Sequence, residues 1–196
     1  MGKRLFDCLG SIAGILFILP FTPFIALAIL LEDGGPVLIE LDRISRGRII
    51  KVYKFRSMVK NAHAMKKTLM HLNERVDGPF FKIKNDPRLT KVGRFLRKFR
   101  LDEFPQFINV LRGELALVGP RPHEPEEMLK YPPEFKNLYF AKGGLTGLSQ
   151  VSGASALPFR RELELDYHYL QNQSLFMDSK ILAKTVGIFF TDPTGV

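Results

Sequence analysis

Cysteine is nearly absent from this sequence, with Cys8 alone among 196 residues. A disulfide within the chain is therefore excluded, which is typical of proteins kept in a reducing compartment. The spacings of cysteine and histidine that hold structural zinc are missing as well. The four histidines follow no triad or metal-ligand spacing, and no serine lies in a nucleophile-elbow sequence. The chemistry of this protein is therefore not expected to depend on a disulfide, a zinc ion or an activated serine.

Acidic residues are in the minority. The chain has 29 lysines and arginines against 20 aspartates and glutamates, which gives a formal net charge of +9. Such an excess suits an anionic partner: a lipid headgroup, a phosphate-bearing substrate or a nucleic acid. Internal repeats and low-complexity linkers are absent, and apolar residues make up 45% of the chain. That composition, at this length, predicts one folded body with a sizeable core.

Charge is missing altogether from residue 8 to residue 31, a run of 24 residues. As one helix the run would be about 36 Å long, and a bilayer core is about 30 Å thick. A signal peptide has a similar composition, but Leu30-Leu31-Glu32-Asp33 offers no small-residue cleavage site. We therefore expect the segment to be retained as a membrane anchor.

Two prolines interrupt this run near its middle. Pro20 and Pro23 cannot donate the backbone hydrogen bonds that a continuous helix requires. The break leaves two halves of 12 residues, each about 18 Å long and thus about as deep as half a membrane. Basic residues lie on both sides of the run, namely Lys3, Arg4, Arg43, Arg46, Arg48 and Lys51. Positive flanks favour the cytoplasmic side, so we prefer a re-entrant hairpin over a proline-kinked spanning helix.

The rest of the chain reads as a mostly helical body with one small β-hairpin. Strands are predicted over residues 37–41 and 49–55, joined by a turn at Arg46-Gly47-Arg48. Helices are predicted over residues 59–75, 91–99, 102–112, 124–131, 133–140, 162–170 and 176–190. A short apolar run covers residues 115–118, and a glycine-rich loop covers residues 142–153. The last helix combines many apolar residues with Lys180 and Lys184, as either a core helix or one lying on a bilayer would.

The dipeptide Asp102-Glu103 is the strongest candidate for chemistry. One interpretation is structural, with Asp102 capping the following helix and Glu103 favouring its dipole. The other interpretation is catalytic and depends on the eight basic residues between positions 82 and 100, a stretch in which Asp86 is the only acidic residue. Cations hold phosphate oxygens in phosphoryl transfer, while a carboxylate attacks or binds Mg²⁺. Basic surroundings also favour the ionised form of Asp102.

Three further basic side chains are candidates for binding phosphate. Strand alternation places Lys54 and Arg56 on one face, which is either a solvated sheet face or a pair of cations aimed at one site. Arg121 lies between Pro120 and Pro122 in a rigid loop. Its planar guanidinium is suited to binding a phosphate or carboxylate, although such a loop alone is more often structural.

These motifs occur in an order that resembles one known family. In chain order they are Lys3-Arg4-Leu5-Phe6-Asp7, an apolar segment with proline, Lys54-Phe55-Arg56-Ser57-Met58, Leu101-Asp102-Glu103, Gly119-Pro120-Arg121-Pro122, Gly144-Leu145-Thr146-Gly147 and Glu164-Leu165-Asp166. The ordered set covers nearly the whole chain. It resembles the bacterial sugar transferases, specifically the monotopic phosphoglycosyl transferases.

The resemblance implies a reaction. Such enzymes transfer a sugar-1-phosphate from a UDP-sugar to undecaprenyl phosphate and release UMP, at the first membrane step of polysaccharide or glycoconjugate assembly. The acidic dyad of the family falls on Asp102 and Glu103. By this resemblance, Asp102 attacks the sugar-bearing phosphate and forms a covalent aspartyl phospho-sugar. Glu103 assists proton transfer or orients the lipid phosphate, and Mg²⁺ is held by Asp102 and substrate oxygens.

The resemblance also implies binding residues and a topology. The positions that match phosphate-binding, nucleotide-binding or late acidic family positions are Lys54, Arg56, Arg97, Pro120, Arg121, Pro122 and Asp166. It implies a re-entrant membrane domain over residues 1–33 and a catalytic body over residues 34–196 with interfacial amphipathic helices. The body is expected on the cytoplasmic face of the bacterial inner membrane, in contact with membrane lipids and with no nucleic acid as a partner. A homodimer is one assembly that the sequence allows.

The chain departs from the family pattern in two places. Leu19 stands where a serine usually precedes the helix-breaking proline, and Pro23 is additional, so the position of the break is open. The glycine-rich loop has Gly143-Gly144, Leu148 and Ala154-Ser155 where the family often has Pro-Gly, an aromatic residue and a later arginine. Contacts with the nucleotide or sugar at this loop, and the identity of the sugar, are therefore open.

Two rival functions are compatible with the sequence. A membrane-anchored basic protein that binds anionic lipid or nucleic acid would account for the net charge, and its binding would survive Asp102→Ala. A nucleotide-sugar hydrolase with the same dyad would release UMP without polyprenol phosphate.

Overall fold

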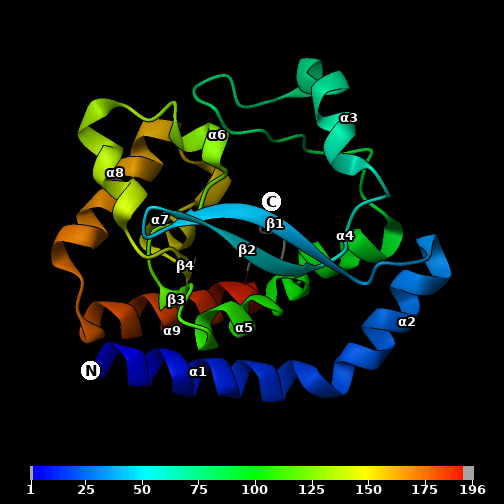
Figure 1. The fold of residues 1–196 in the computed structure, drawn as a ribbon, viewed down its shortest axis with the longest axis horizontal. Coiled ribbons are helices and arrows are strands. Elements are labelled where there is room, and N and C mark those ends of the chain that lie inside the picture. The colour runs from blue at the N-terminus through cyan, green and yellow to red at the C-terminus, as the bar shows by residue number, and fades with distance from the viewer. Residues whose placement is uncertain (1, 192–196) are drawn as a thin grey trace.

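The structure is a computed structural model that describes residues 2–191 (Figure 1). Its helical elements are α1 (Gly2–Ile18), η1 (Leu19–Phe21), α2 (Thr22–Asp33), α3 (Ala62–Thr68), η2 (Met70–Leu72), α4 (Lys91–Lys98), η3 (Leu101–Glu103), α5 (Gln106–Leu111), α6 (Pro125–Met128), η4 (Pro133–Phe140), α7 (Leu148–Val151), η5 (Ala154–Ala156), α8 (Phe159–Asn172) and α9 (Leu175–Thr191). The strands are β1 (Leu38–Ser45), β2 (Arg48–Phe55), β3 (Ala116–Val118) and β4 (Gly144–Thr146). The prediction of a mostly helical protein with a small hairpin is therefore confirmed.

The N-terminal helical segment bends at its prolines. α1 ends at Ile18, the 3₁₀ turn η1 contains Pro20, and α2 begins at Thr22 with Pro23 in its first turn. A proline is tolerated there because the first N–H groups of a helix have no partner within the helix. The Thr22 hydroxyl donates to the Ile18 carbonyl at 3.1 Å across the bend. In Figure 1, α2 turns away from the line of α1 at this point.

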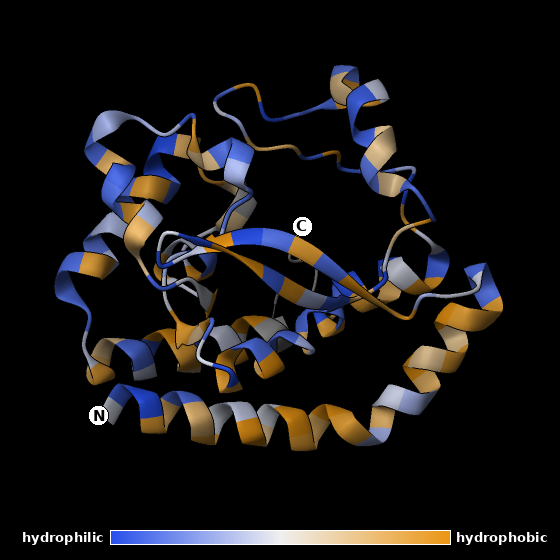
Figure 2. Cartoon of the chain, in the orientation of Figure 1, coloured by the Kyte–Doolittle hydropathy of each residue, from blue (hydrophilic) through white to orange (hydrophobic). Residues whose placement is uncertain are grey.

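Most of the apolar surface of this segment is exposed. Among the described residues, positions 2–33 form the one helical stretch long and apolar enough to cross a membrane. Figure 2 shows apolar residues along both α1 and α2. The large exposed apolar side chains here are Leu5, Leu9, Ile12, Leu16, Phe17, Leu19, Phe21, Phe24, Leu27, Leu30 and Leu31. An exposed apolar surface of this kind suggests association with a membrane.

The start of α1 is fixed to the body by charged side chains. The Lys3 ammonium lies 2.6 Å from a carboxylate oxygen of Asp178 in α9. Arg4 donates to the carbonyls of Val110 and Leu111 at 2.6 and 2.5 Å, at the end of α5. Such bonds satisfy carbonyls that have no partner within a helix. α1 therefore lies beside α5 and α9, as Figure 1 shows.

The end of α2 is fixed to the body as well. The two carboxylate oxygens of Glu32 accept the backbone N–H groups of Lys91 and Val92 at 2.6 and 2.8 Å. These N–H groups belong to the first turn of α4, which Thr90 caps through Gly93. A carboxylate at this position satisfies unpaired donors and favours the helix dipole. The apolar segment over residues 2–33 is thus attached to the body at both of its ends.

The hairpin lies across the middle of the body (Figure 1). β1 and β2 pair antiparallel from Leu38 opposite Phe55 to Ser45 opposite Arg48. Arg46 and Gly47 form the turn, both at positive φ, as two-residue hairpin turns require. Asn109 of α5 closes the open edge of β2, since its side chain accepts from the Tyr53 N–H and donates to the Lys51 carbonyl. The hairpin is therefore held on α5 by polar contacts.

A second, parallel sheet of β3 and β4 was not predicted. Gly144 approaches the backbone of Gly119 so closely that an added Cβ would lie 2.1 Å from its nitrogen, so glycine is required there. β3 is buried throughout, as central parallel strands usually are. Leu117 and Val118 of β3 belong to the main core cluster, which consists of Val52, Val110, Leu115, Leu117, Val118, Val151, Tyr169 and Ile181.

Three predicted helices are shorter in the structure, and the one predicted over residues 124–131 is only the four-residue α6. The helix predicted over residues 59–75 is reduced to α3 and the 3₁₀ turn η2. Asn73 ends it, because its side chain bonds the backbone of Arg75, Phe80 and Lys82 and so offers the chain an alternative to helix. The helix predicted over residues 102–112 begins only at Gln106, after Pro105. The acidic pair thereby lies in a separate turn.

Candidate active site

The acidic pair occupies η3, a single 3₁₀ turn between α4 and α5. Arg100 adopts a left-handed conformation, with φ of 51°, and redirects the chain out of α4. The position that precedes α5 is Pro105, with no side-chain cap. Asp102 therefore does not act as the cap of this helix, which was the structural interpretation of the sequence.

Lys54 of β2 binds Glu103 directly. Its ammonium nitrogen lies 2.6 Å from the Glu103 Oε1. Burial tends to raise the pKa of Glu103, but the positive charges of Lys54 and Arg121, the Lys54 hydrogen bond and the charge of Arg100 lower it to about 2. Glu103 is thus a carboxylate throughout the physiological pH range.

Asp102 is in a different state from its neighbour. Its side chain is buried, with 4% of the residue exposed. Burial raises the pKa of Asp102 and the adjacent Glu103 charge adds to this, whereas the charges of Lys54 and Arg97 work in the opposite direction. The basic surroundings therefore do not make this carboxyl more acidic than usual. Two neighbouring carboxyls with opposite pKa shifts are typical of sites that assign them different tasks.

Arg97 reaches the pair from the last turn of α4. Its Nε donates to the Ser57 hydroxyl at 3.1 Å, and its charge acts on Asp102. Gly93 allows this approach, because an added Cβ would lie 1.8 Å from the Ser57 carbonyl oxygen. The contacts of Glu32 and Thr90 at the start of α4 hold the same helix.

Arg56 does not join the other cations. It is buried, and its guanidinium donates from Nη2 to the Gly34 carbonyl and from Nη1 to the Gly35 carbonyl, the latter at 3.1 Å. Its guanidinium also lies 3.4 Å from Asp33. Alternation along the strand predicts one face for Lys54 and Arg56, but β2 ends at Phe55, so the pattern no longer applies at position 56. Arg56 instead links the end of α2 to the body.

Arg121 lies in the loop after β3 with its side chain exposed. Its positive charge lowers the pKa of Glu103 and acts on Arg43, which places it on the same side as the acidic pair. The Pro120 carbonyl accepts the Gly144 N–H at 2.8 Å, and an added Cβ on Gly143 would lie 2.9 Å from the Pro122 side chain. The two prolines thus hold this loop against the glycine-rich loop.

Asp166 of α8 lies behind the Arg121 loop. Its Oδ2 accepts the Arg121 backbone N–H at 3.1 Å. Burial raises the pKa of Asp166 to about 6, although hydrogen bonds from Ser149 and Arg121 offset part of the effect. The side chain is 2% exposed. Asp166 therefore contacts the backbone of the loop that presents Arg121.

Three residues of this site were not predicted from the sequence. Arg100 and Arg43 add positive charge around Glu103, and Glu32 fixes the helix that carries Arg97. Arg100 directly precedes the Leu101-Asp102-Glu103 motif and offered a weak signal. Arg43 and Glu32 are distant in sequence, so no local pattern connects them to the acidic pair.

The site suits a hard divalent cation only in part. Among residues 2–191, no cluster of three or more His, Cys, Asp or Glu side chains forms a ready metal cage. Mg²⁺ usually takes one or two carboxylates and completes its shell with water and substrate phosphates. The buried Asp102, whose ionised form is disfavoured beside Glu103, fits this kind of site because a cation would offset both charges.

Comparison with known proteins places the whole chain in one family. The family model for bacterial sugar transferases matches residues 1–192. The galactosyl transferase CpsE of Streptococcus agalactiae serotype III is 39% identical over 190 residues, which are 96% of this chain and 42% of that protein. The undecaprenyl-phosphate galactose phosphotransferase of Salmonella typhimurium is 39% identical over 95% of this chain and 40% of its own length.

A relative of more similar length also matches. The exopolysaccharide production protein ExoY of Rhizobium meliloti is 36% identical over 190 residues, which are 95% of this chain and 84% of that protein. The chain therefore spans about two fifths of the first two relatives and most of the third.

Proposed function

This chain belongs to the bacterial sugar transferase family, and from that premise we propose that it transfers a sugar-1-phosphate from a UDP-sugar to undecaprenyl phosphate, releasing UMP. The observation that carries the proposal is the contact between Lys54 and Glu103 beside the buried Asp102. Two adjacent carboxyls within a group of cations are suited to phosphoryl transfer and have no use in a protein that merely binds anions.

The proposed reaction has two steps at Asp102. In the first, a carboxylate oxygen of Asp102 forms a bond to the sugar-bearing phosphorus, and the bond from that phosphorus to the bridging oxygen breaks, so that UMP leaves. In the second, an oxygen of undecaprenyl phosphate forms a bond to the same phosphorus and the aspartyl oxygen departs. The product is the lipid diphosphate sugar, and Asp102 is regenerated.

The cations have a binding role in this scheme. Lys54, Arg97 and Arg121 act on the acidic pair from three different elements. Positive charge at fixed positions stabilises the negative charge of a transferring phosphoryl group. When bound, Mg²⁺ would be held by Asp102 and substrate oxygens and would offset charge on the diphosphate.

Glu103 is suited to orientation rather than to proton transfer. A carboxylate with a pKa of about 2 is a weak base at neutral pH. It holds Lys54 at 2.6 Å, so it fixes the position of one cation that meets the incoming phosphate. We assign the attack to Asp102 and the positioning of Lys54 to Glu103.

The re-entrant topology is part of the proposal. Lys3 at the start of the membrane segment and Glu32 at its end both contact the same body. A segment that crossed the bilayer would place its two ends on opposite sides, so these contacts support a hairpin that enters and leaves by one face. The body would then lie at the cytoplasmic face of the inner membrane, where a soluble UDP-sugar and a lipid phosphate meet.

The proposal is tested by following UMP. The protein in nanodiscs is incubated with a panel of UDP-sugars, Mg²⁺ and undecaprenyl phosphate, beside an Asp102→Asn variant and a reaction without lipid. Release of more than one equivalent of UMP per enzyme that requires both the lipid and Asp102 supports the transferase and identifies the sugar. Continued UMP release over many turnovers without lipid would establish a hydrolase, and no release from any sugar would overturn the proposal.

A further inference from the structure

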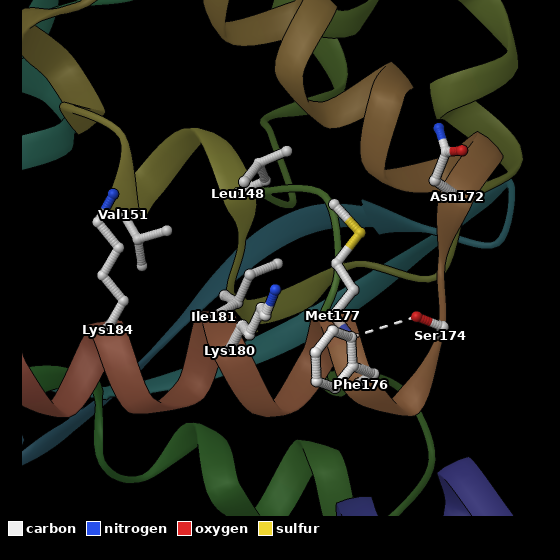
Figure 3. Close-up of a pocket in the computed structure, with 9 residues that line it drawn as sticks. All are labelled: Leu148, Val151, Asn172, Ser174, Phe176, Met177, Lys180, Ile181 and Lys184. Carbon is white, nitrogen blue, oxygen red and sulfur yellow. Dashed lines mark hydrogen bonds between the residues drawn. The ribbon is translucent and has the colours of Figure 1, made fainter.

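A pocket of about 410 Å³ lies between α7 and α9 (Figure 3). Its apolar side chains are Leu148 and Val151 from α7 and Met177 and Ile181 from α9. Val151 and Ile181 also belong to the main core cluster. The floor of the pocket is therefore part of the rigid body, and the acidic pair and its cations do not line it.

Two lysines stand at this pocket. Lys180 and Lys184 are one helical turn apart on α9, and in Figure 3 the Lys184 side chain rises beside Val151. No acidic residue lines the pocket among the described residues. The nearby Asp178 is buried and bound to Lys3 and Tyr169, so it is engaged on the other side of α9. The pocket thus combines an apolar wall with uncompensated positive charge.

The pocket lies next to the membrane segment. An added Cβ on Gly2, at the start of α1, would lie 3.2 Å from the Leu175 side chain at the start of α9. Lys3 binds Asp178 one turn further along. Phe176, which lines the pocket, is 70% exposed, and the Lys180 ammonium lies 4.2 Å from the centre of its ring. An exposed aromatic ring beside lysines is typical of a protein surface at the lipid headgroups.

We propose that this pocket binds an anionic phospholipid of the surrounding bilayer, at a site separate from the acidic pair. The lipid phosphate meets Lys180 and Lys184, and an acyl chain covers the accessible side chains of Leu148, Phe176 and Met177. A soluble phosphate would leave the apolar wall uncovered. A zwitterionic lipid would bring its own cation towards the two lysines. The combination of charge and apolar surface therefore favours an anionic lipid. This inference rests on one part of the proposed function, the location of the protein at a membrane.

The absence of tryptophan allows a direct test. A Phe176→Trp variant has one tryptophan, placed at the pocket and excited at a wavelength that the five tyrosines do not absorb. It is reconstituted in nanodiscs that contain brominated phosphatidylglycerol or brominated phosphatidylcholine. We expect stronger quenching by the anionic lipid. Adding Lys180→Gln and Lys184→Gln is expected to weaken the apparent affinity for that lipid about thirtyfold, since one lysine near an anionic surface contributes about fivefold.

Two controls make the result specific. Lys67→Gln with Lys136→Gln removes the same charge from exposed positions outside the pocket, and we expect it to keep the preference for anionic lipid. Leu9→Trp places the fluorophore on the exposed side of α1, where both brominated lipids should quench it equally well if the protein is in the bilayer. Equal quenching of the Phe176→Trp variant by the two lipids, with Leu9→Trp quenched normally, would overturn the site and leave the membrane location intact. An equal loss of the preference for anionic lipid in the Lys180/Lys184 variant and in the Lys67/Lys136 variant would also overturn the site, because general surface charge would then account for the preference.

Discussion

Replacement of Lys54 by methionine tests how the site distributes charge between its two carboxyls. The pKa of Glu103 is about 2, against an ordinary value of 4.5, and each pKa unit corresponds to about 1.4 kcal/mol. Burial, which opposes ionisation, and the surrounding cations, which favour it, thus together favour the ionised form by about 3 kcal/mol. Lys54 supplies the largest favourable part, so its loss is expected to cost about 2 kcal/mol of the free energy of unfolding at pH 7.

The same change affects activity through Asp102. The charge of Lys54 is the main influence that lowers the pKa of Asp102 against burial. Without it the pKa rises further, and a smaller fraction of Asp102 is ionised and able to attack. We expect the acid limb of the kcat/KM profile for UMP release to move up by about one pH unit.

The pH dependence of stability has a defined sign. Because the pKa of folded Glu103 is depressed, the stabilisation by Lys54 is fully present above pH 4.5 and is lost as the pH falls towards 2. Thermal unfolding in detergent, followed by circular dichroism, should therefore separate Lys54→Met from the parent at pH 7 and bring them closer at pH 3.

Lys51→Met is the matched control, since Lys51 lies on the same strand in an exposed pair with Asp42. Exposed pairs contribute little, so this variant should resemble the parent in both assays. If Lys54→Met behaved like Lys51→Met in the pH profile and in thermal unfolding, the proposed coupling between Lys54 and the acidic pair would be refuted.

Three further variants test separate contacts. The parent should lose stability as the pH rises from 4 to 6, by about 3 kcal/mol at most, because a carboxyl whose pKa is raised to about 6 favours the fold only while it is protonated. Asp166→Asn should remove this pH dependence. Melting temperatures that change equally between pH 5 and pH 7 in both proteins would contradict this. Glu32→Ala should lower the free energy of unfolding by about 1 kcal/mol, because α4 loses a helix cap, and should lower the turnover by displacing Arg97. Glu32→Gln should retain more of the stability and of the turnover. Unchanged turnover in Glu32→Ala would show that α4 does not need this contact. Gly14→Leu should lower the melting temperature, since even a Cβ would lie 2.4 Å from the Phe107 ring, and the outer-facing Ile12→Leu is the control that should not.

Local patterns in the sequence were sufficient for much of the fold. The hairpin was predicted from a turn at Arg46-Gly47-Arg48 between two short strands, and a helix was predicted over residues 91–99, where α4 lies. The parallel pairing of β3 with β4 was not predictable in the same way. It depends on the close approach of Gly119 to Gly144, and glycines in a loop signal flexibility as readily as close packing.

The site illustrates the same limit at the level of side chains. Asp102 and Glu103 were identified from their position after a basic stretch, and Lys54 does reach Glu103. Arg56 was expected beside Lys54, but its direction is set by the carbonyls of Gly34 and Gly35. Opposite pKa shifts for adjacent carboxyls depend on burial and on charges from distant segments. Burial and the positions of distant charges are known only once the chain is folded.

The covalent step at Asp102 is the central claim, and intact-protein mass spectrometry tests it most directly. The protein in nanodiscs is incubated with Mg²⁺ and the UDP-sugar that supports UMP release, but without undecaprenyl phosphate. We predict an added mass of one sugar-phosphate on the parent, none on Asp102→Asn, and loss of the adduct when the lipid is supplied. An adduct that persists in Asp102→Asn, or UMP release that requires lipid while no adduct forms at any time, would contradict the account.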